Sequence, residues 1–293
     1  MKLFVFGLGY SARQFIGLYR DRFTRIAGTV RSPEKAEEIS ATGIDAYRFD
    51  ATGHDPRILH DLAEADSLLV SIPPGETDPV LDRFAEAVAA VPRLRWVGYL
   101  STVGVYGNAN GGWVDEDTPP NPATLRSRQR IAAERQWLDL GERKAIAVKV
   151  FRLAGIYGPG RNALAKVADG TARRIVKPGQ VFNRIHTEDI AQVLMASIDR
   201  PSQNAIYNVA DDEPGPPQDV IAYGAELLGR EPPPEIPFDE AEMTPMARSF
   251  YADNKRVRNT RLKTDLGVML RYPTYREGLR ALLRAGDGIR REG

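Results

Sequence analysis

Short apolar runs alternate with amphipathic stretches along the first part of the chain. The runs are rich in β-branched and aromatic residues and predict strands, whereas the stretches between them have helical spacing. Strands that alternate with helices predict a parallel sheet covered by helices. The predicted strands span residues 3–6, 25–30, 46–49, 67–72, 96–101 and 145–153, and the predicted helices span 11–22, 82–90 and 125–140, with one more starting at 32–34.

After residue 153 the pattern loosens, because Pro and Gly gather at 158–160, 213–217 and 231–237. Residues 185–209 again resemble core sheet. We therefore expect an α/β, Rossmann-type doubly wound parallel sheet with a smaller C-terminal substrate lobe. The expected divisions are a nucleotide-binding domain of residues 1–155, to which 183–210 return, a lobe of 156–182 and 211–285, and a tail of 286–293 that frays from Ala285.

Composition narrows the class of protein. The 293 residues carry 40 Lys and Arg against 39 Asp and Glu, a net charge of +1, which argues against nucleic acid or a membrane surface as partner. The absence of Cys excludes disulfides, thiolate metal sites and a Cys nucleophile, and the three scattered His argue against zinc, so no metal is expected. The apolar start is too short for a secretory signal, and no run approaches the roughly 20 apolar residues of a membrane span. A cytoplasmic protein is expected.

A glycine turn follows the first predicted strand and opens a helix. In this turn Gly7 permits the tight bend, Gly9 lets the backbone approach a pyrophosphate, and Ala12 allows close packing of helix on strand. Tyr10 and Ser11 stand at the helix start, where free N–H groups favour an anion. A plain glycine turn in another βαβ protein is the alternative, but the strand, spacing and helix together favour a dinucleotide site.

The residue after the second strand distinguishes the two nicotinamide dinucleotides. A site for NAD carries Asp or Glu there, to bind the ribose hydroxyls. This chain has Arg31 and Ser32, with Lys35 one turn later. A guanidinium can bind a 2′-phosphate through two hydrogen bonds, so the pattern favours NADP, with NAD as the alternative if Arg31 is merely solvated.

Taken in order, the segments FGLGYSA, TVRS, SLLVSIPP, YLSTVGVYG, WVDEDTPPNP, RLAGIYGPGR, NRIHTEDIA and YNVADDEP resemble the extended short-chain dehydrogenase/reductases, the NAD-dependent epimerase/dehydratase family. The resemblance covers nearly the whole chain. It implies a Rossmann domain that binds NAD(P) and a small lobe that closes over the substrate. It also implies that Asp50 and Ala51 lie near the adenine, and that Ser71, Ile72 and Pro73 line the cofactor.

The resemblance further implies a catalytic Ser or Thr after the fifth strand and a Tyr-x-x-x-Lys pair on the next helix. Thr102 matches the Ser or Thr, but the pair falls on Arg126 and Arg130. A guanidinium stays protonated, so Arg126 cannot serve as general acid–base at neutral pH. The two arginines share a helix face and either bind an anion beside the nicotinamide or form a solvated basic surface. Tyr106, a structural residue in most such segments, and Thr102 are the nearest alternative proton donors by sequence.

The substrate positions depart from the family as well. Gly155 and Phe182 stand where nucleotide-sugar enzymes carry Asn and Arg, which puts a nucleotide-sugar substrate in doubt. Trp113 and Phe182 are candidate pocket residues, although aromatic side chains more often belong to the core. Arg161 faces either the cleft or solvent. Among the remaining polar groups, His186 is expected to be structural, and the acidic loop 115–117 is expected to serve turn geometry.

Two functions from different classes follow. The first is an NADP-dependent oxidoreductase or epimerase-like enzyme with altered proton-transfer residues, acting on a small molecule for which an anionic group is one option. The alternative is a catalytically silent dinucleotide-binding protein that senses redox state or binds a partner, because fold alone does not settle function. A homodimer is compatible with the family, but no segment of the sequence identifies an interface.

Overall fold

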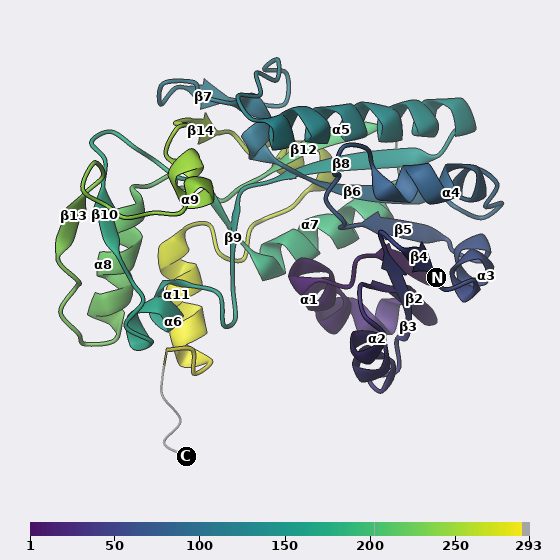
Figure 1. The fold of residues 1–293 in the computed structure, drawn as a ribbon, viewed down its shortest axis with the longest axis horizontal. Helices are drawn as coiled ribbons and strands as arrows, with labels where there is room; N and C mark the ends of the chain where they lie inside the picture. Colours follow the sequence, from purple (N-terminus) through teal and green to yellow (C-terminus); the bar gives the residue numbers. More distant parts are fainter. Residues whose placement is uncertain (202, 289–293) are drawn as a thin grey trace.

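The computed structural model describes residues 1–201 and 203–288. Eight strands form one sheet in the order β12-β8-β6-β5-β1-β2-β3-β4, and each pair is parallel except β3 with β4 (Figure 1). This doubly wound arrangement confirms the predicted fold class. The strands of the sheet are β1 (Lys2–Phe6), β2 (Arg25–Val30), β3 (Asp45–Asp50), β4 (Gly53–His54), β5 (Ser67–Val70), β6 (Trp96–Thr102), β8 (Ala147–Leu153) and β12 (Ala205–Val209).

Helices cover both faces of the sheet because its strands are apolar on both sides. In β1, Leu3 and Val5 belong to one core cluster, whereas Phe4 and Phe6 belong to the cluster on the opposite face. The first cluster includes α1 (Tyr10–Tyr19), α2 (Pro33–Ser40), α7 (Thr187–Asp199) and α10 (Thr260–Leu266). The second includes α3 (Arg57–Ala63), α4 (Pro79–Ala89) and α5 (Leu125–Lys144).

Several element ends differ from the sequence prediction for local reasons. A 3-10 helix (Arg20–Arg22) replaces the last turn expected of α1. The α4 helix begins at Pro79 rather than at residue 82, because the carboxylate of Asp78 accepts hydrogen bonds from the N–H groups of Val80 and Leu81, both at 3.0 Å. The α5 helix runs to Lys144 and ends where Ala145 adopts a left-handed conformation, with φ of 53°.

The prediction that residues 185–209 form core sheet is wrong for most of that segment. Only β12 joins the large sheet, as its edge strand beside β8. Residues 187–199 form α7, and β11 (Arg184–His186) instead pairs with β9 (Gly155–Tyr157) in a separate two-stranded sheet. The apolar residues that suggested strands belong to α7, most of which is buried.

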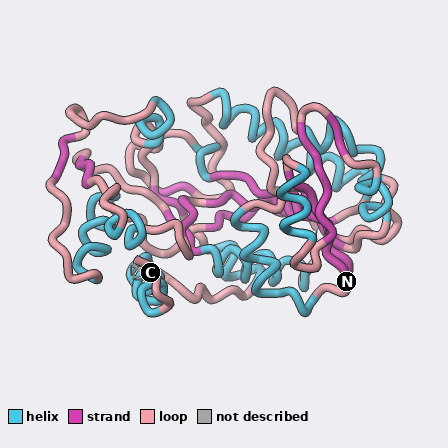
Figure 2. Tube along the Cα trace, turned by 60° about the horizontal axis from the view of Figure 1, so that its bottom comes forward, coloured by secondary structure: helices cyan, strands magenta, loops and turns pink. Residues whose placement is uncertain are grey.

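The remaining elements form the smaller lobe beside the carboxyl ends of the strands (Figure 2). They are α6 (Ala163–Ala168), β10 (Arg174–Val176), α8 (Pro217–Leu227), β13 (Glu235–Pro237), α9 (Pro245–Phe250) and α11 (Tyr275–Arg284). The predicted domain division stays a prediction, but one segment assigned to the lobe packs against the large domain instead. Residues of 257–270 share the core of α1 and α7, and β14 (Arg256–Val257) pairs with β7 (Trp113–Val114).

The chain end departs from the expectation that it frays from Ala285. The carboxylate of Asp287 accepts hydrogen bonds from Gly160 N at 2.8 Å and from Asn162 Nδ2 at 2.5 Å, so the described part of the tail is fixed against the lobe. Residues 289–293 of the predicted tail lie outside the described residues. Within the described ranges, no helix is long and apolar enough to cross a membrane.

Candidate active site

The glycine turn lies at the carboxyl edge of the sheet, between β1 and α1. Gly7 has φ of +94°, and a Cβ there would lie 2.9 Å from Cγ1 of Ile72, so glycine is required both by conformation and by space. Thr29 of β2 fixes the turn from the next strand. Its hydroxyl accepts a hydrogen bond from Gly7 N at 3.0 Å, and its carbonyl accepts one from Leu8 N at 2.8 Å.

The first turn of α1 offers open N–H groups. Gly9 is the N-cap, no side chain caps the helix and no acidic residue stands in its first turn. A Cβ on Gly9 would meet nothing within 4 Å, so the space before the turn is open. Among the described residues, the N–H groups of Tyr10, Ser11 and Ala12 have no acceptor. This combination fits the pyrophosphate of a dinucleotide.

Of the three residues predicted to select the cofactor, Arg31 is the one whose side chain has no partner among the described residues. Its side chain is exposed and makes no hydrogen bond or ion pair within the described part of the chain. Ser32 caps α2, where its hydroxyl accepts from Lys35 N at 3.3 Å, and the Lys35 ammonium pairs with Glu38 at 2.6 Å. Arg31 is therefore the side chain that can turn to a 2′-phosphate without losing a partner.

The other predicted cofactor residues lie at two neighbouring strand ends. The carboxylate of Asp50, at the end of β3, accepts from Arg48 Nε at 2.6 Å and Thr52 N at 2.7 Å, and these bonds hold the pKa of Asp50 below its usual range. Ala51 beside it is exposed. Ser71, Ile72 and Pro73 follow β5, where Ser71 N donates to the carbonyl of Phe6 at 2.8 Å; this places the segment next to the glycine turn.

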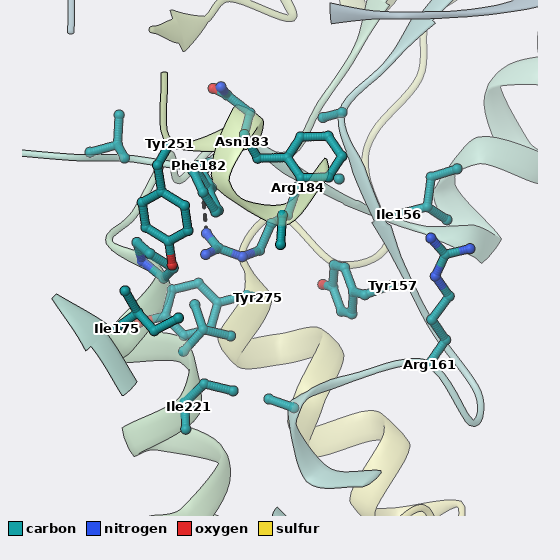
Figure 3. Close-up of a pocket in the computed structure, with 18 of the residues that line it drawn as sticks. Ile156, Tyr157, Arg161, Ile175, Phe182, Asn183, Arg184, Ile221, Tyr251 and Tyr275 are labelled. Atoms are coloured by element: carbon teal, nitrogen blue, oxygen red, sulfur yellow. Dashed lines mark hydrogen bonds between the residues drawn. The ribbon is translucent and has the colours of Figure 1, made fainter. Parts of the chain in front are cut away.

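A cavity of about 1420 Å³ lies between the carboxyl ends of β6 and β8 and the lobe (Figure 3). Thr102, Gly155, Arg161 and Phe182 all line it, as does Arg126 of α5. The structure thus brings five of the predicted catalytic and substrate residues to one space. The walls are largely apolar and carry six cationic side chains against two acidic ones, which favours a ligand with an anionic group.

Thr102 and Arg126 remain candidates, whereas Arg130 does not line this cavity. The hydroxyl of Thr102 accepts from Gly104 N at 3.0 Å and keeps its own proton to donate. Arg126 is exposed at the rim. Arg130 turns toward the sheet, where its Nη1 donates to the carbonyl of Leu100 at 2.8 Å and to Tyr99 Oη at 3.2 Å. The expectation of an anion clamp built from both arginines therefore reduces to Arg126.

Tyr106 belongs to a buried polar network and is not at the cavity. It ends a 3-10 helix (Val103–Tyr106), is 3% exposed, and donates to Asn208 Oδ1 at 2.8 Å while accepting from Arg152 Nη1 at 2.9 Å. Arg152 in turn pairs with Glu134 at 2.8 Å, both buried. Burial raises the pKa of Tyr106. With both hydrogen-bonding functions used internally, Tyr106 is a structural residue, as its sequence context favoured.

Two further candidates lie away from the cavity. Trp113 sits on β7 under the guanidinium of Arg258, 5.0 Å from its ring, and does not line the cavity. Its strand pairs with β14, with Trp113 opposite Arg256. In the acidic loop, Asp115 accepts from Thr118 N at 3.0 Å, which agrees with the turn interpretation. Glu116 departs from it, because its carboxylate accepts from Asn208 N of β12 at 2.8 Å and so links the loop to the sheet.

Residues that sequence reasoning missed form the far wall of the cavity. They include Arg184, Tyr251 and Lys255. The Lys255 ammonium donates to the carbonyl of Gly107 at 2.8 Å and pairs with Asp253 at 3.2 Å, and burial lowers its pKa. No local pattern marks these positions, because Arg184 is placed by the pairing of β9 with β11, Lys255 precedes β14, which pairs with β7, and Tyr251 packs against the distant Phe182.

Tyr10 links the glycine turn to the lobe. Its Oη donates to the carbonyl of Pro159 at 3.0 Å, and the guanidinium of Arg161 lies 5.7 Å from its ring. Gly158 permits this approach, since a Cβ there would lie 2.8 Å from Tyr10 Oη and 2.3 Å from the hydroxyl of Thr187. Direct contacts therefore join the glycine turn at the start of α1 to the segment 158–161 at the cavity.

Known proteins resemble this chain over most of its length. The model of the NAD dependent epimerase/dehydratase family matches residues 82–210. The solved structure of a functionally unknown conserved protein from Silicibacter pomeroyi DSS is 50% identical, with 98% of this chain and 99% of that chain covered and a TM-score of 0.88. Protein YeeZ of Escherichia coli K12 is 29% identical over 247 residues, which cover 79% of this chain and 85% of that protein.

The fold recurs at lower identity. A UDP-glucose 4-epimerase from Thermus thermophilus, solved in complex with NAD, is 18% identical, with 98% of this chain and 100% of that chain covered and a TM-score of 0.71. The order of strands, the glycine turn after β1 and the lobe at the carboxyl ends of the strands agree with the family match. The match to the NAD-dependent epimerase/dehydratase family covers residues 82–210, and the fold of the described residues is that of the solved epimerase.

Proposed function

We propose that this protein is an NADP(H)-dependent oxidoreductase acting on a small molecule that carries an anionic group. The observation that carries the proposal is the cavity of about 1420 Å³ between the ends of β6 and β8 and the lobe. Ligands of doubly wound folds bind at the carboxyl ends of the strands. A space of this size, apolar with a few polar groups, suits a substrate larger than a simple metabolite such as an aldehyde.

The glycine turn and the open N–H groups at the start of α1 are evidence for a dinucleotide cofactor. The family match and the NAD complex of the Thermus thermophilus epimerase support the same cofactor class. A bound nicotinamide supplies or accepts the hydride. The open N–H groups of α1 would bind its pyrophosphate, and the segment 71–73 would line it from the neighbouring strand. Arg31 favours the phosphorylated form, because the chain has no carboxylate at that position to bind the ribose hydroxyls.

Two residues of the chain would take separate roles in the reaction. Thr102 would donate a hydrogen bond, without transfer of its proton, to the reacting oxygen of the substrate, as its match in the family implies. Lys255 is our candidate proton source, since it lines the cavity and burial lowers its pKa. For reduction of a carbonyl, hydride would add to the carbon, the proton of the ammonium would pass to the oxygen, and Lys255 would be left neutral until solvent reprotonates it.

The two arginines on α5 favour a second function, a silent dinucleotide-binding protein. Arg126 and Arg130 occupy the positions of the family's proton-transfer pair, and neither can titrate at neutral pH. The two functions are separated by turnover. A purified-protein screen of NADPH oxidation with aldehydes and ketones that also carry a carboxylate would show consumption for an enzyme, and binding without consumption for a sensor.

The cofactor preference is tested with Arg31→Ala. Loss of a charge-assisted bond to phosphate should weaken NADP⁺ binding by roughly tenfold to a hundredfold and leave NAD⁺ binding unchanged. Calorimetry measures both affinities, and Arg83→Ala on α4, another exposed arginine, is the matched control. Equal losses for the two cofactors would mean that Arg31 does not recognise the 2′-phosphate.

A further inference from the structure

Arg184 is a partly buried cation whose free edge belongs to the cavity. It begins β11 and lines the same cavity as Thr102. Its Nη1 donates to the carbonyls of Phe182 at 3.0 Å and Gly215 at 3.1 Å. Its Nε and Nη2 make no hydrogen bond to the described residues. The guanidinium therefore keeps one edge with two parallel donors for a ligand.

No carboxylate within the described ranges lies at ion-pair distance from Arg184. The acidic groups that influence it most are Asp211 and Glu213. Burial raises the pKa of Asp211 well above its usual range, which weakens this carboxyl as a permanent counter-charge. Glu213 already forms an ion pair with Arg276. A desolvated guanidinium without a paired carboxylate is unfavourable, and an anionic ligand would compensate it.

The hydrogen bonds of Arg184 are not needed to hold the backbone together. Phe182 N donates to the carbonyl of Gly215 at 2.9 Å, and Gly215 N donates to the carbonyl of Phe182 at 3.1 Å. Both acceptors of Arg184 thus already have a backbone donor. A purely structural role would explain this buried charge poorly, because its removal leaves no carbonyl unpaired.

Aromatic side chains surround the free edge. The hydroxyl of Tyr251 lies beside the guanidinium of Arg184 in the view of Figure 3, the charge of Arg184 lowers the pKa of Tyr251 against the larger effect of burial, and the hydroxyl makes no hydrogen bond to the described residues. Arg184 lies over the ring of Tyr275, 5.8 Å from its centroid, and Phe182 packs edge-on against Tyr251 at 5.0 Å. Tyr251 can therefore provide a third donor at a site whose walls are aromatic.

The rest of this end of the cavity is apolar. Ile175 and Ile221 face it in Figure 3. On α9, Met246 and Phe250 also line the cavity although they are 58% and 60% exposed. Large apolar side chains left exposed around a cavity gain most when an apolar ligand covers them.

We infer that Arg184 and Tyr251 form a carboxylate-binding subsite, and that the substrate is a carboxylic acid with an aromatic or other apolar body. The two donors on the free edge of Arg184 match the two oxygens of one carboxylate. The carboxylate would lie in the lobe, with the body directed toward Thr102, so the reacting carbonyl stands away from the acid group. The identity of the substrate class rests on the proposed oxidoreductase function, whereas the anion subsite itself does not.

The test uses benzoate, 3-phenylpropionate and hexanoate as probes, with the matching amides as neutral controls. Ligand-observed NMR titrations on the full chain, with and without NADP⁺, give the dissociation constants. The acids should bind at least tenfold more tightly than the amides. Arg184→Gln should weaken the acids by roughly tenfold to a hundredfold, Tyr251→Phe should weaken them by roughly threefold to tenfold, and neither should change amide binding.

Arg230→Gln is the matched control. Arg230 lies in the same lobe and also donates through Nη1 to two carbonyls, those of Val167 and Ala168, but it does not line the cavity. Its loss should leave acid binding unchanged. Acids that bind no better than amides, acids that do not bind, or an equal response to Arg184→Gln and Arg230→Gln would each overturn the subsite.

The same titrations separate the two proposals. Acid binding that depends on Arg184, together with no binding of NADPH, would leave the subsite intact and refute the oxidoreductase. NADPH binding and turnover with neutral carbonyl compounds, without preference for acids, would support the oxidoreductase and refute the subsite.

Discussion

Replacing His186 by Asn is expected to remove one of two opposing pH-dependent contributions to the stability of this protein. His186 caps α7, where its Nδ1 accepts from Glu188 N at 3.2 Å, and its ring lies 5.1 Å from that of Tyr157 and 4.2 Å from that of Tyr272. It is 1% exposed, and burial lowers its pKa from 6.5 to about 4. Asn preserves the cap but cannot titrate.

The magnitude follows from linkage. Between pH 6.5 and 4 the unfolded chain binds a proton at this position and the folded protein does not, so the stability present above pH 6.5 is lost as the pH falls. The loss is about 2 kcal/mol at pH 5 and about 3 kcal/mol at pH 4, relative to pH 8. Asp189, whose pKa burial raises to about 6, contributes the opposite slope, since its stabilisation declines as the pH rises from 3.8 to 6. In the free energy of unfolding plotted against pH, the two contributions therefore offset each other. The difference between His186→Asn and the natural sequence contains only the contribution of the histidine.

Urea unfolding at a series of pH values between 5 and 8 measures the effect. His186→Asn should be less stable than the natural sequence at pH 8, because the ring packing is lost. That difference should shrink by about 2 kcal/mol at pH 5. His60→Asn, an exposed histidine of α3, should show no such change. A constant difference between His186→Asn and the natural sequence across the range would refute the reasoning.

The remaining predictions concern the reaction. Thr102→Val should lower kcat by roughly tenfold to a thousandfold in steady-state assays, as for loss of an oxyanion donor, whereas an unchanged kcat would leave Thr102 only its bond to Gly104 N. Arg126→Met should shift the ratio of NADPH to NADP⁺ affinity toward NADP⁺ by roughly fivefold, because a positive charge at the cavity rim disfavours the oxidised ring. Arg130→Met should leave that ratio unchanged and lower the urea midpoint; a shifted ratio would place Arg130 at the ring. Lys255→Met should abolish turnover while NADPH still binds, and the natural enzyme should lose activity as the pH rises through the lowered pKa of Lys255; unchanged turnover would exclude this proton source.

Sequence patterns predicted the main sheet well because its strands are buried on both faces. The run in β1 has both alternating sets of side chains in a core, and β2 begins and ends at the predicted residues. Local chemistry also predicted α2, which Ser32 caps and Pro33 begins. By contrast, β7, β9 and β11 contain only two or three residues each. Such strands exist through pairing with distant segments, which no local periodicity records.

The candidate site divides in the same way. The glycine turn was predictable because a tight turn and a helix start impose residue types locally. The position of Arg126 and Arg130 was also predictable by resemblance, but the direction of each side chain was not. Arg130 finds the carbonyl of Leu100 on β6 and turns from the cavity, while Arg126, one turn earlier, reaches its rim. The sequence did not single out Arg184, because its role depends on having no paired carboxylate among the described residues. That property arises only when the chain is folded.

The packing around α5 bears on which residues the proposed reaction could use. Arg130, which the resemblance aligns with the family's lysine, donates a hydrogen bond to the carbonyl of Leu100 in β6, and Tyr106 is fixed in a buried network with Arg152. Neither can be recruited to the substrate without breaking bonds in the core. The titratable groups left along the cavity, Tyr251 and Lys255 among them, come instead from the C-terminal lobe. An enzyme built this way would use its Rossmann domain to bind the cofactor and to orient the reacting oxygen, and its lobe to supply both the proton and the recognition of the substrate anion.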